Sequence, residues 1–170
     1  MIMKIKIQLK KIFLCLFLVS AGCGFQPLYA QKENLIEQTT AVQISPIAGA
    51  GGYQLELILK DKLNPEGIQT SKKYQLNVTL KQPRYANQSI RSDNFASLES
   101  MVVEADYQLI DISKQNILIS SSVHSNGLFN LIKDPYATVV ARDKLYDNLI
   151  QLMGNDIAMH VLSYFKEDKP

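Results

Sequence analysis

The alternation of apolar and polar residues along the chain predicts four strands and two helices. The clearest strand covers residues 74–81, where every second side chain is apolar and the others are polar. A strand with this pattern buries one face against a core and leaves the other face in water. In chain order, the expected elements are a strand at 41–44, a helix ending near 63, strands at 74–81, 103–109 and 117–125, and a helix at 135–165.

The two expected helices each carry one apolar face. In the first, Leu55, Ile58, Leu59 and Leu63 recur at the spacing of a 3.6-residue period. In the second, an apolar stripe runs from 146 to 164, and Gly154 interrupts it, so a kink is expected there. Together these elements predict an α+β fold, a two-layer sandwich in which a four-stranded sheet carries two helices on one face, in the order β-α-β-β-β-α.

Residues 82–97 lack a periodic pattern and are expected to form a long polar connection. This segment contains Arg84, Tyr85 and Arg91, and it follows a strand that ends at Pro83. Connections of this length in a small domain are usually functional or disordered.

The first 22 residues have the features of a secretory signal peptide. Four lysines and no acid precede an uninterrupted apolar run at 12–19, and small residues close the segment. The run is shorter than the roughly 20 residues that a transmembrane helix needs. The segment is therefore expected to be removed during export.

Cys23 follows Ala21 and Gly22, as does the acylated cysteine of a bacterial lipobox. Residues 24–170 contain no other cysteine, so the chain cannot form an internal disulfide after processing. We expect Cys23 to carry the lipid anchor, although Ser20 stands where the lipobox prefers leucine. The alternative is an ordinary cleavage site with a chance cysteine. Gly24, rather than aspartate, follows the cysteine, which favours the outer membrane, on its periplasmic side.

Removal of the signal changes the charge of the protein. Four of the 18 basic residues lie within it, which leaves 14 basic against 16 acidic residues and a net charge of −2. This balance gives no support for nucleic-acid binding. The expected organisation is a signal at 1–22, a lipidated N-terminus and tether at 23–40, one domain at 41–166, and a tail at 167–170.

The charges are unevenly distributed. Lys81, Arg84 and Arg91 lie in an interval without acidic residues. In the following stretch, from 93 to 111, all the charged residues are acidic. The basic residues could contact a phosphorylated or carboxylated partner. The alternative is that they pair with acids of the neighbouring strand, which contributes only a few tenths of a kcal/mol per pair.

No catalytic motif or metal-ligand spacing occurs in the sequence, so we expect neither an enzyme nor a cofactor or metal beyond the lipid on Cys23. His124 and His160 are the only histidines. Asp156 lies four residues before His160, and a pair at the helix surface explains this spacing better than a catalytic pair.

Residues 23–29 read Cys-Gly-Phe-Gln-Pro-Leu-Tyr and resemble the start of the lipopolysaccharide-assembly lipoproteins, the LptE family, in particular its alphaproteobacterial branch. The pattern continues through the glycine-preceded helix, the strands beginning at 74 and containing 105–111, and the last helix beginning at 134–137. The long connection at 82–97 departs from it.

This resemblance implies a protein that plugs the LptD β-barrel of the outer membrane, helps it assemble, and assists lipopolysaccharide delivery to the cell surface. Lipid A phosphates would then be partners for Lys81, Arg84 and Arg91. The alternative is an accessory binding lipoprotein of another periplasmic lipid-trafficking system, which shares the anchor and the size.

Overall fold

The computed structural model describes residues 35–90 and 96–167. In this part of the chain, a mixed sheet of five strands packs against two main helices. The elements are a short helical segment at 35–40, β1 (Val42–Ile44), α3 (Gly52–Leu63), β2 (Tyr74–Leu80), β3 (Arg84–Ile90), β4 (Ala96–Asp111), β5 (Asn116–Asn130) and α4 (Pro135–Glu167).

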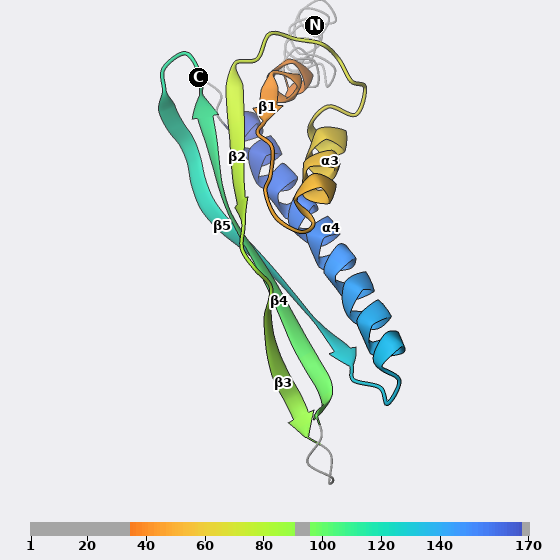
Figure 1. Cartoon of the computed structure of the whole chain (residues 1–170). Helices are drawn as coiled ribbons and strands as arrows, with labels where there is room; N and C mark the ends of the chain where they lie inside the picture. The colour runs from red at the N-terminus through yellow and green to blue at the C-terminus, as the bar shows by residue number, and fades with distance from the viewer. Residues whose placement is uncertain (1–34, 91–95, 168–170) are drawn as a thin grey trace, which may run out of the picture. The chain divides into compact units, whose positions relative to one another are not determined.

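Strand β4 is the centre of the sheet and has different neighbours along its two edges (Figure 1). On one edge, β2 pairs with residues 105–111 and β3 pairs with residues 96–102, both antiparallel. On the other edge, β5 pairs antiparallel along nearly the whole strand. The short β1 adds to β2 in parallel.

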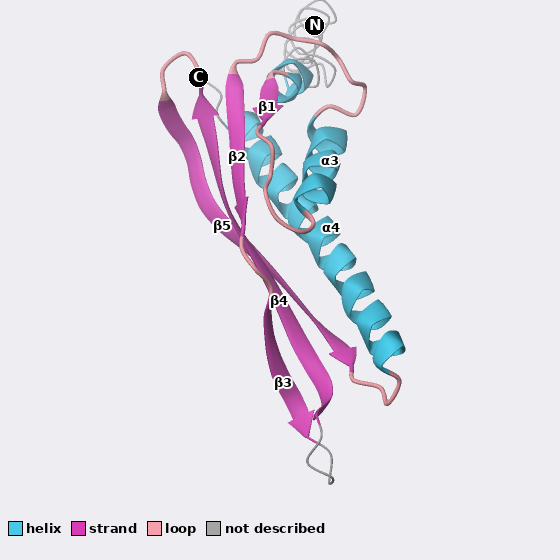
Figure 2. Ribbon diagram, in the orientation of Figure 1, coloured by secondary structure: helices cyan, strands magenta, loops and turns pink. Residues whose placement is uncertain are grey.

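Both helices lie on the same side of the sheet (Figure 2), which confirms the expected two-layer α+β arrangement. The core forms between them because each element turns its apolar positions inward. Leu55 and Leu59 of α3, Leu76 of β2, Leu109 of β4 and Ile150 of α4 are fully buried in it.

The expectation for residues 82–97 was wrong, because this segment contributes a fifth strand. β3 occupies residues 84–90, and β4 begins at residue 96 instead of 103. The segment shows no alternation because Arg84, Tyr85, Ala86 and Asn87 are all exposed. This strand is stabilised by backbone hydrogen bonds with β4. Such pairing does not require alternating apolar side chains, so the sequence pattern does not predict it.

Gly154 does not interrupt the last helix, which is continuous from Pro135 to Glu167. The residue is buried at the contact with α3, where a Cβ atom would lie 2.6 Å from Cγ2 of Ile58 and 3.2 Å from Cδ1 of Leu55. Glycine therefore allows close packing of the two helices, and the expected kink is not needed to explain it.

The folded unit also includes residues that were assigned to the tether. Residues 35–40 are helical, and Leu35 packs against the core. The carbonyl of the buried Thr40 accepts hydrogen bonds from Oγ1 of Thr70 and Nζ of Lys72, both at 2.8 Å. The expected signal peptide, the remainder of the tether and the last three residues lie outside the described residues.

Candidate functional site

The side of the sheet away from the helices, which we call the open face, is built from short polar side chains. Because strand residues alternate between faces, the apolar residues of β2 and β4 point to the core and the polar ones point outward. The outward-facing residues at the middle of the sheet are Asn77 and Thr79 of β2, Glu104, Asp106 and Gln108 of β4, and Ser120 and Ser122 of β5.

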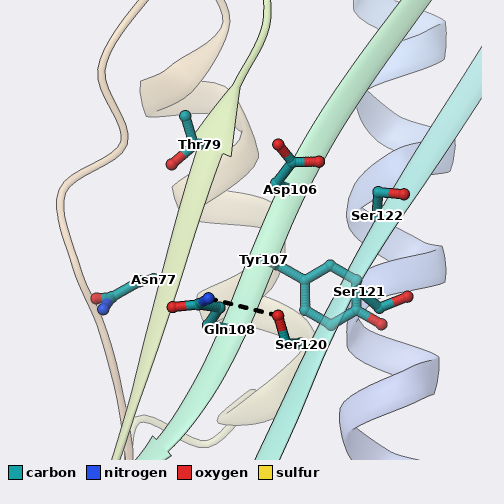
Figure 3. Close-up of a pocket in the computed structure, with 8 residues that line it drawn as sticks. All are labelled: Asn77, Thr79, Asp106, Tyr107, Gln108, Ser120, Ser121 and Ser122. Atoms are coloured by element: carbon teal, nitrogen blue, oxygen red, sulfur yellow. Dashed lines mark hydrogen bonds between the residues drawn. The ribbon is translucent and has the colours of Figure 1, made fainter. Parts of the chain in front are cut away.

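All of these side chains except that of Glu104 line a hollow of about 510 Å³ on the sheet (Figure 3). Nε2 of Gln108 donates a hydrogen bond to Oγ of Ser120 over 3.4 Å. The ring of Tyr107 belongs to the opposite layer, where it is 2% exposed. The hollow thus offers amide, hydroxyl and carboxylate groups, which suit hydrogen bonding to a polar partner.

Charged residues lie at the end of the hollow where β2 passes into β3. Nζ of Lys81 lies 2.9 Å from Oε1 of Glu104 and 3.0 Å from Oδ2 of Asp106, and a guanidinium nitrogen of Arg84 lies 3.0 Å from Oε2 of Glu104. The hydrogen bond from Lys81 lowers the pKa of Glu104, and the same bond raises the pKa of Lys81.

The structure therefore brings together two of the three expected lipopolysaccharide-contact residues, Lys81 and Arg84, on one carboxylate of β4. This is the strand pairing that the sequence left open as the alternative. Contact of these residues with lipopolysaccharide stays a prediction. Arg91 and Cys23 lie outside the described residues.

The hydrogen-bond partner of His160 is not Asp156, four residues earlier in the helix, but a residue of the sheet. Nδ1 of His160 lies 2.6 Å from the hydroxyl of Tyr107 on β4, and among the described residues no ion pair joins it to Asp156. The pair links α4 to the sheet, which is a structural role. Burial raises the pKa of Tyr107, against a smaller opposite effect of a hydrogen bond with Ser121.

Residues 35–90 and 96–167 contain no cluster of three or more histidine, cysteine, aspartate or glutamate side chains that could hold a metal ion. None of the helices in those ranges combines the length and apolar character that crossing a membrane requires.

A second set of residues, which the sequence analysis missed, is a group of exposed apolar side chains at the connection of β5 to α4. We call this the β5–α4 corner, and it consists of Ile132, Tyr136, Val139 and Val140, which are between 42% and 77% exposed. The available signal was the spacing of Tyr136, Val139 and Val140 at i, i+3 and i+4, outside the stripe that begins at 146.

Comparisons with known proteins identify the fold. No family model and no curated protein matches the sequence. A crystal structure described as a candidate lipoprotein from Caulobacter crescentus matches with a TM-score of 0.61 at 15% identity, covering 81% of this chain and 99% of that one. Rare lipoprotein B from Shewanella oneidensis matches with a TM-score of 0.57 at 9% identity, covering 71% and 95%.

The chain has an LptE-like lipoprotein fold, that of rare lipoprotein B. The solution structure of a lipoprotein B from Nitrosomonas europaea agrees, with a TM-score of 0.57 at 10% identity over 74% of this chain and 84% of that one. At these identities the likeness concerns the arrangement of helices and strands alone.

Proposed function

We propose that this chain is a lipid-anchored protein of the outer membrane, attached through Cys23 on the periplasmic side, that plugs the LptD β-barrel. In this role it helps the barrel assemble and assists lipopolysaccharide delivery to the cell surface, without catalysing a reaction. The proposal joins the resemblance of residues 23–29 to the LptE family with the rare lipoprotein B fold of the domain.

The observation that carries the proposal is the polar open face on this fold. The interior of a large outer-membrane barrel is polar and filled with water. A domain that sits there needs a surface that forms hydrogen bonds without burying unpaired charge. The open face meets this need, since Asn77, Thr79, Gln108, Ser120 and Ser122 are uncharged hydrogen-bonding residues. Its two carboxylates, Glu104 and Asp106, are paired with Lys81.

The basic residues fit the lipopolysaccharide part of the proposal through exchange of partners. Lys81 and Arg84 bind carboxylates at the protein surface, where their own side chains are 42% and 72% exposed. Exposed pairs of this kind contribute little to stability, because water and salt screen them. A phosphate group can therefore replace Glu104 as their partner at little cost, and arginine suits bidentate contact with phosphate.

The test is purification of the full-length chain in mild detergent, with its partners identified by mass. We expect a large outer-membrane barrel to co-purify. A Leu149→Asp variant keeps the signal and Cys23 but loses the core, and it should not retain the barrel. Absence of any barrel from the native protein, or recovery of transporter subunits in its place, would overturn the proposal.

The surface that meets the barrel can be tested with two matched double variants. Gln108→Arg/Ser122→Arg places two bulky charges on the open face, and Gln151→Arg/Ser163→Arg places two on exposed positions of α4. We expect the first pair to reduce barrel recovery more strongly. Equal recovery with both variants would show that the open face does not make the decisive contact.

A further inference from the structure

The sheet has three outer strands, and two of them are protected against pairing with another chain. Unpaired strand edges attract other strands, and proteins limit this with short strands, charges or bulges. β1 has three residues. β3 has seven residues, begins with Arg84, and its pairing with β4 contains register shifts at Asn87/Ser89 and Ser89/Ile90.

The third outer strand, β5, lacks these protections along most of its length. It has 15 residues and contains no lysine, arginine, aspartate, glutamate or proline. One register shift occurs near its start, opposite Leu109 and Ile110. Among the strands that the structure describes, only β4 pairs with it, and nothing lies beside its outer edge in the upper half of Figure 1.

Helix α4 does not shield the middle of this strand. Ser121 faces the helix side, as its partner Tyr107 on β4 does, yet Ser121 is exposed. The neighbouring residues Ser120 and Ser122 are exposed on the open face. The backbone of residues 120–122 is therefore accessible at the edge from both sides of the sheet.

We propose that the outer edge of β5 pairs antiparallel with the same edge of a second copy of this chain, centred on Ser121. This register places Ile119 opposite Val123 of the second copy on the core-facing side, and Ser120 opposite Ser122 on the open face. Apolar residues thus meet apolar ones and hydroxyls meet hydroxyls, and no like charges oppose each other.

The strand's own sequence thus supplies the partner that its edge requires. An added strand must have apolar residues on the helix side, polar residues on the open side, and no charges. β5 satisfies these conditions at four of the five residues 119–123, since Ile119 and Val123 lie on the helix side and Ser120 and Ser122 on the open side. The fifth, Ser121, lies on the helix side and meets the hydroxyl of its own symmetry mate. The pairing joins two sheets into one and satisfies backbone groups that otherwise face water. It does not depend on the proposed role at the barrel.

The first experiment is disulfide trapping in the full-length exported chain. In antiparallel strands, residues directly opposite each other have Cβ atoms about 4.5–5.5 Å apart, so Ser121→Cys lies next to its own symmetry mate. We expect an oxidised band of twice the chain mass that disappears on reduction. The matched control is Ser113→Cys, which is exposed in the turn between β4 and β5. The unsubstituted chain shows whether Cys23 alone forms a disulfide between two chains.

The second experiment uses charge to separate pairing from misfolding. Ser120→Lys/Ser122→Lys, added to the Ser121→Cys chain, puts like charges opposite each other in the dimer and should abolish the band. A second version with Ser120→Glu/Ser122→Glu should also form no dimer band when it is expressed alone. Co-expression of the two versions, distinguished by tags, should restore a mixed dimer, which unfolded chains would not form.

Three results would overturn the proposal. These are equal trapping at Ser113→Cys and Ser121→Cys, persistence of the band with lysines at both positions, and a trapped band whose second component is another protein. Recovery of the barrel is measured separately, so failure of the dimer leaves the proposed function standing, and loss of the barrel leaves the dimer standing.

Discussion

The two parts of α4 differ in how they are held. Every buried residue of the helix lies at or after Leu149, and these residues pack against α3 and the sheet. The first 14 residues, 135–148, contain no buried residue. They include Tyr136, Val139 and Val140 of the β5–α4 corner, which are 77%, 42% and 47% exposed.

This difference separates the residues that maintain the fold from those available for contact. A substitution after Leu149 changes the core, and its cost appears in the free energy of unfolding. Leu145 and Tyr146 still pack against the core, but a substitution at an exposed position of 135–148, such as Val140, meets mostly water. Surface changes of this kind usually lie within about 0.5 kcal/mol. An effect of such a substitution on barrel recovery would therefore report a contact.

The largest expected effect contrasts one aspartate in each part of the helix. Leu149→Asp buries an unpaired charge and should reduce the free energy of unfolding by about 4 kcal/mol or more. Val140→Asp introduces the same side chain at an exposed position and should change it by less than about 1 kcal/mol. Urea denaturation followed by circular dichroism measures both. Similar losses would remove the distinction between the two parts.

The next effect concerns the contact of α4 with α3. Gly154→Ala introduces a Cβ atom 2.6 Å from Cγ2 of Ile58 and should cost about 2 kcal/mol from overpacking, even after the gain in helix propensity. In an Ile58→Ala background the same substitution should cost far less, because Cγ2 of Ile58 is gone and the remaining contacts, with Cβ of residue 58 and Cδ1 of Leu55, are at 3.2 Å. A cost that persists there in full would exclude this clash as the cause.

A smaller effect concerns the link between Tyr107 and His160. Tyr107→Phe removes the hydrogen bond and should cost about 1 kcal/mol at neutral pH. Because burial raises the pKa of Tyr107 above its ordinary value of 10.0, the stability from its neutral form is fully present below pH 10.0 and is lost as pH rises through the raised pKa. Denaturation between pH 8 and pH 11 should show a weaker alkaline decline in the Phe variant.

The smallest expected effect lies where β2 passes into β3. Glu104→Gln removes the carboxylate that Lys81 and Arg84 share, and because these pairs are exposed, the free energy of unfolding should change little. If these cations contact lipopolysaccharide phosphates, the variant should bind lipopolysaccharide more tightly than the native chain, and Lys81→Asp/Arg84→Asp/Arg91→Asp more weakly. Unchanged binding in both would assign the cations to strand pairing alone.

The sequence predicts elements whose side chains repeat against the core. The alternation through Leu76 and Val78 and the spacing of Leu55 and Leu59 identify β2 and α3, because burial on one face produces that periodicity. β3 has no buried face at residues 84–87. The pairing of Arg84 with Val102 of β4 therefore produces no alternation of apolar and polar residues in the sequence.

The candidate site was predictable in composition but not in geometry. The opposite charges of residues 81–84 and 104–106 indicated that the two strands were neighbours, and their pairing with Glu104 was one of the two alternatives. The partner of His160 could not be found in this way, because Tyr107 lies 53 residues away in the chain. The Asp156 spacing pointed to a local partner instead.

The length of β4 has a consequence for a protein placed within a membrane barrel. Sixteen residues at about 3.3 Å each make this strand roughly 50 Å long, and the 33 residues of α4 at 1.5 Å each give roughly the same length. A bilayer with its headgroups is about 40–45 Å thick. One unbroken strand, aligned with the axis of a barrel, would therefore be long enough to span the membrane from its periplasmic surface to its outer surface.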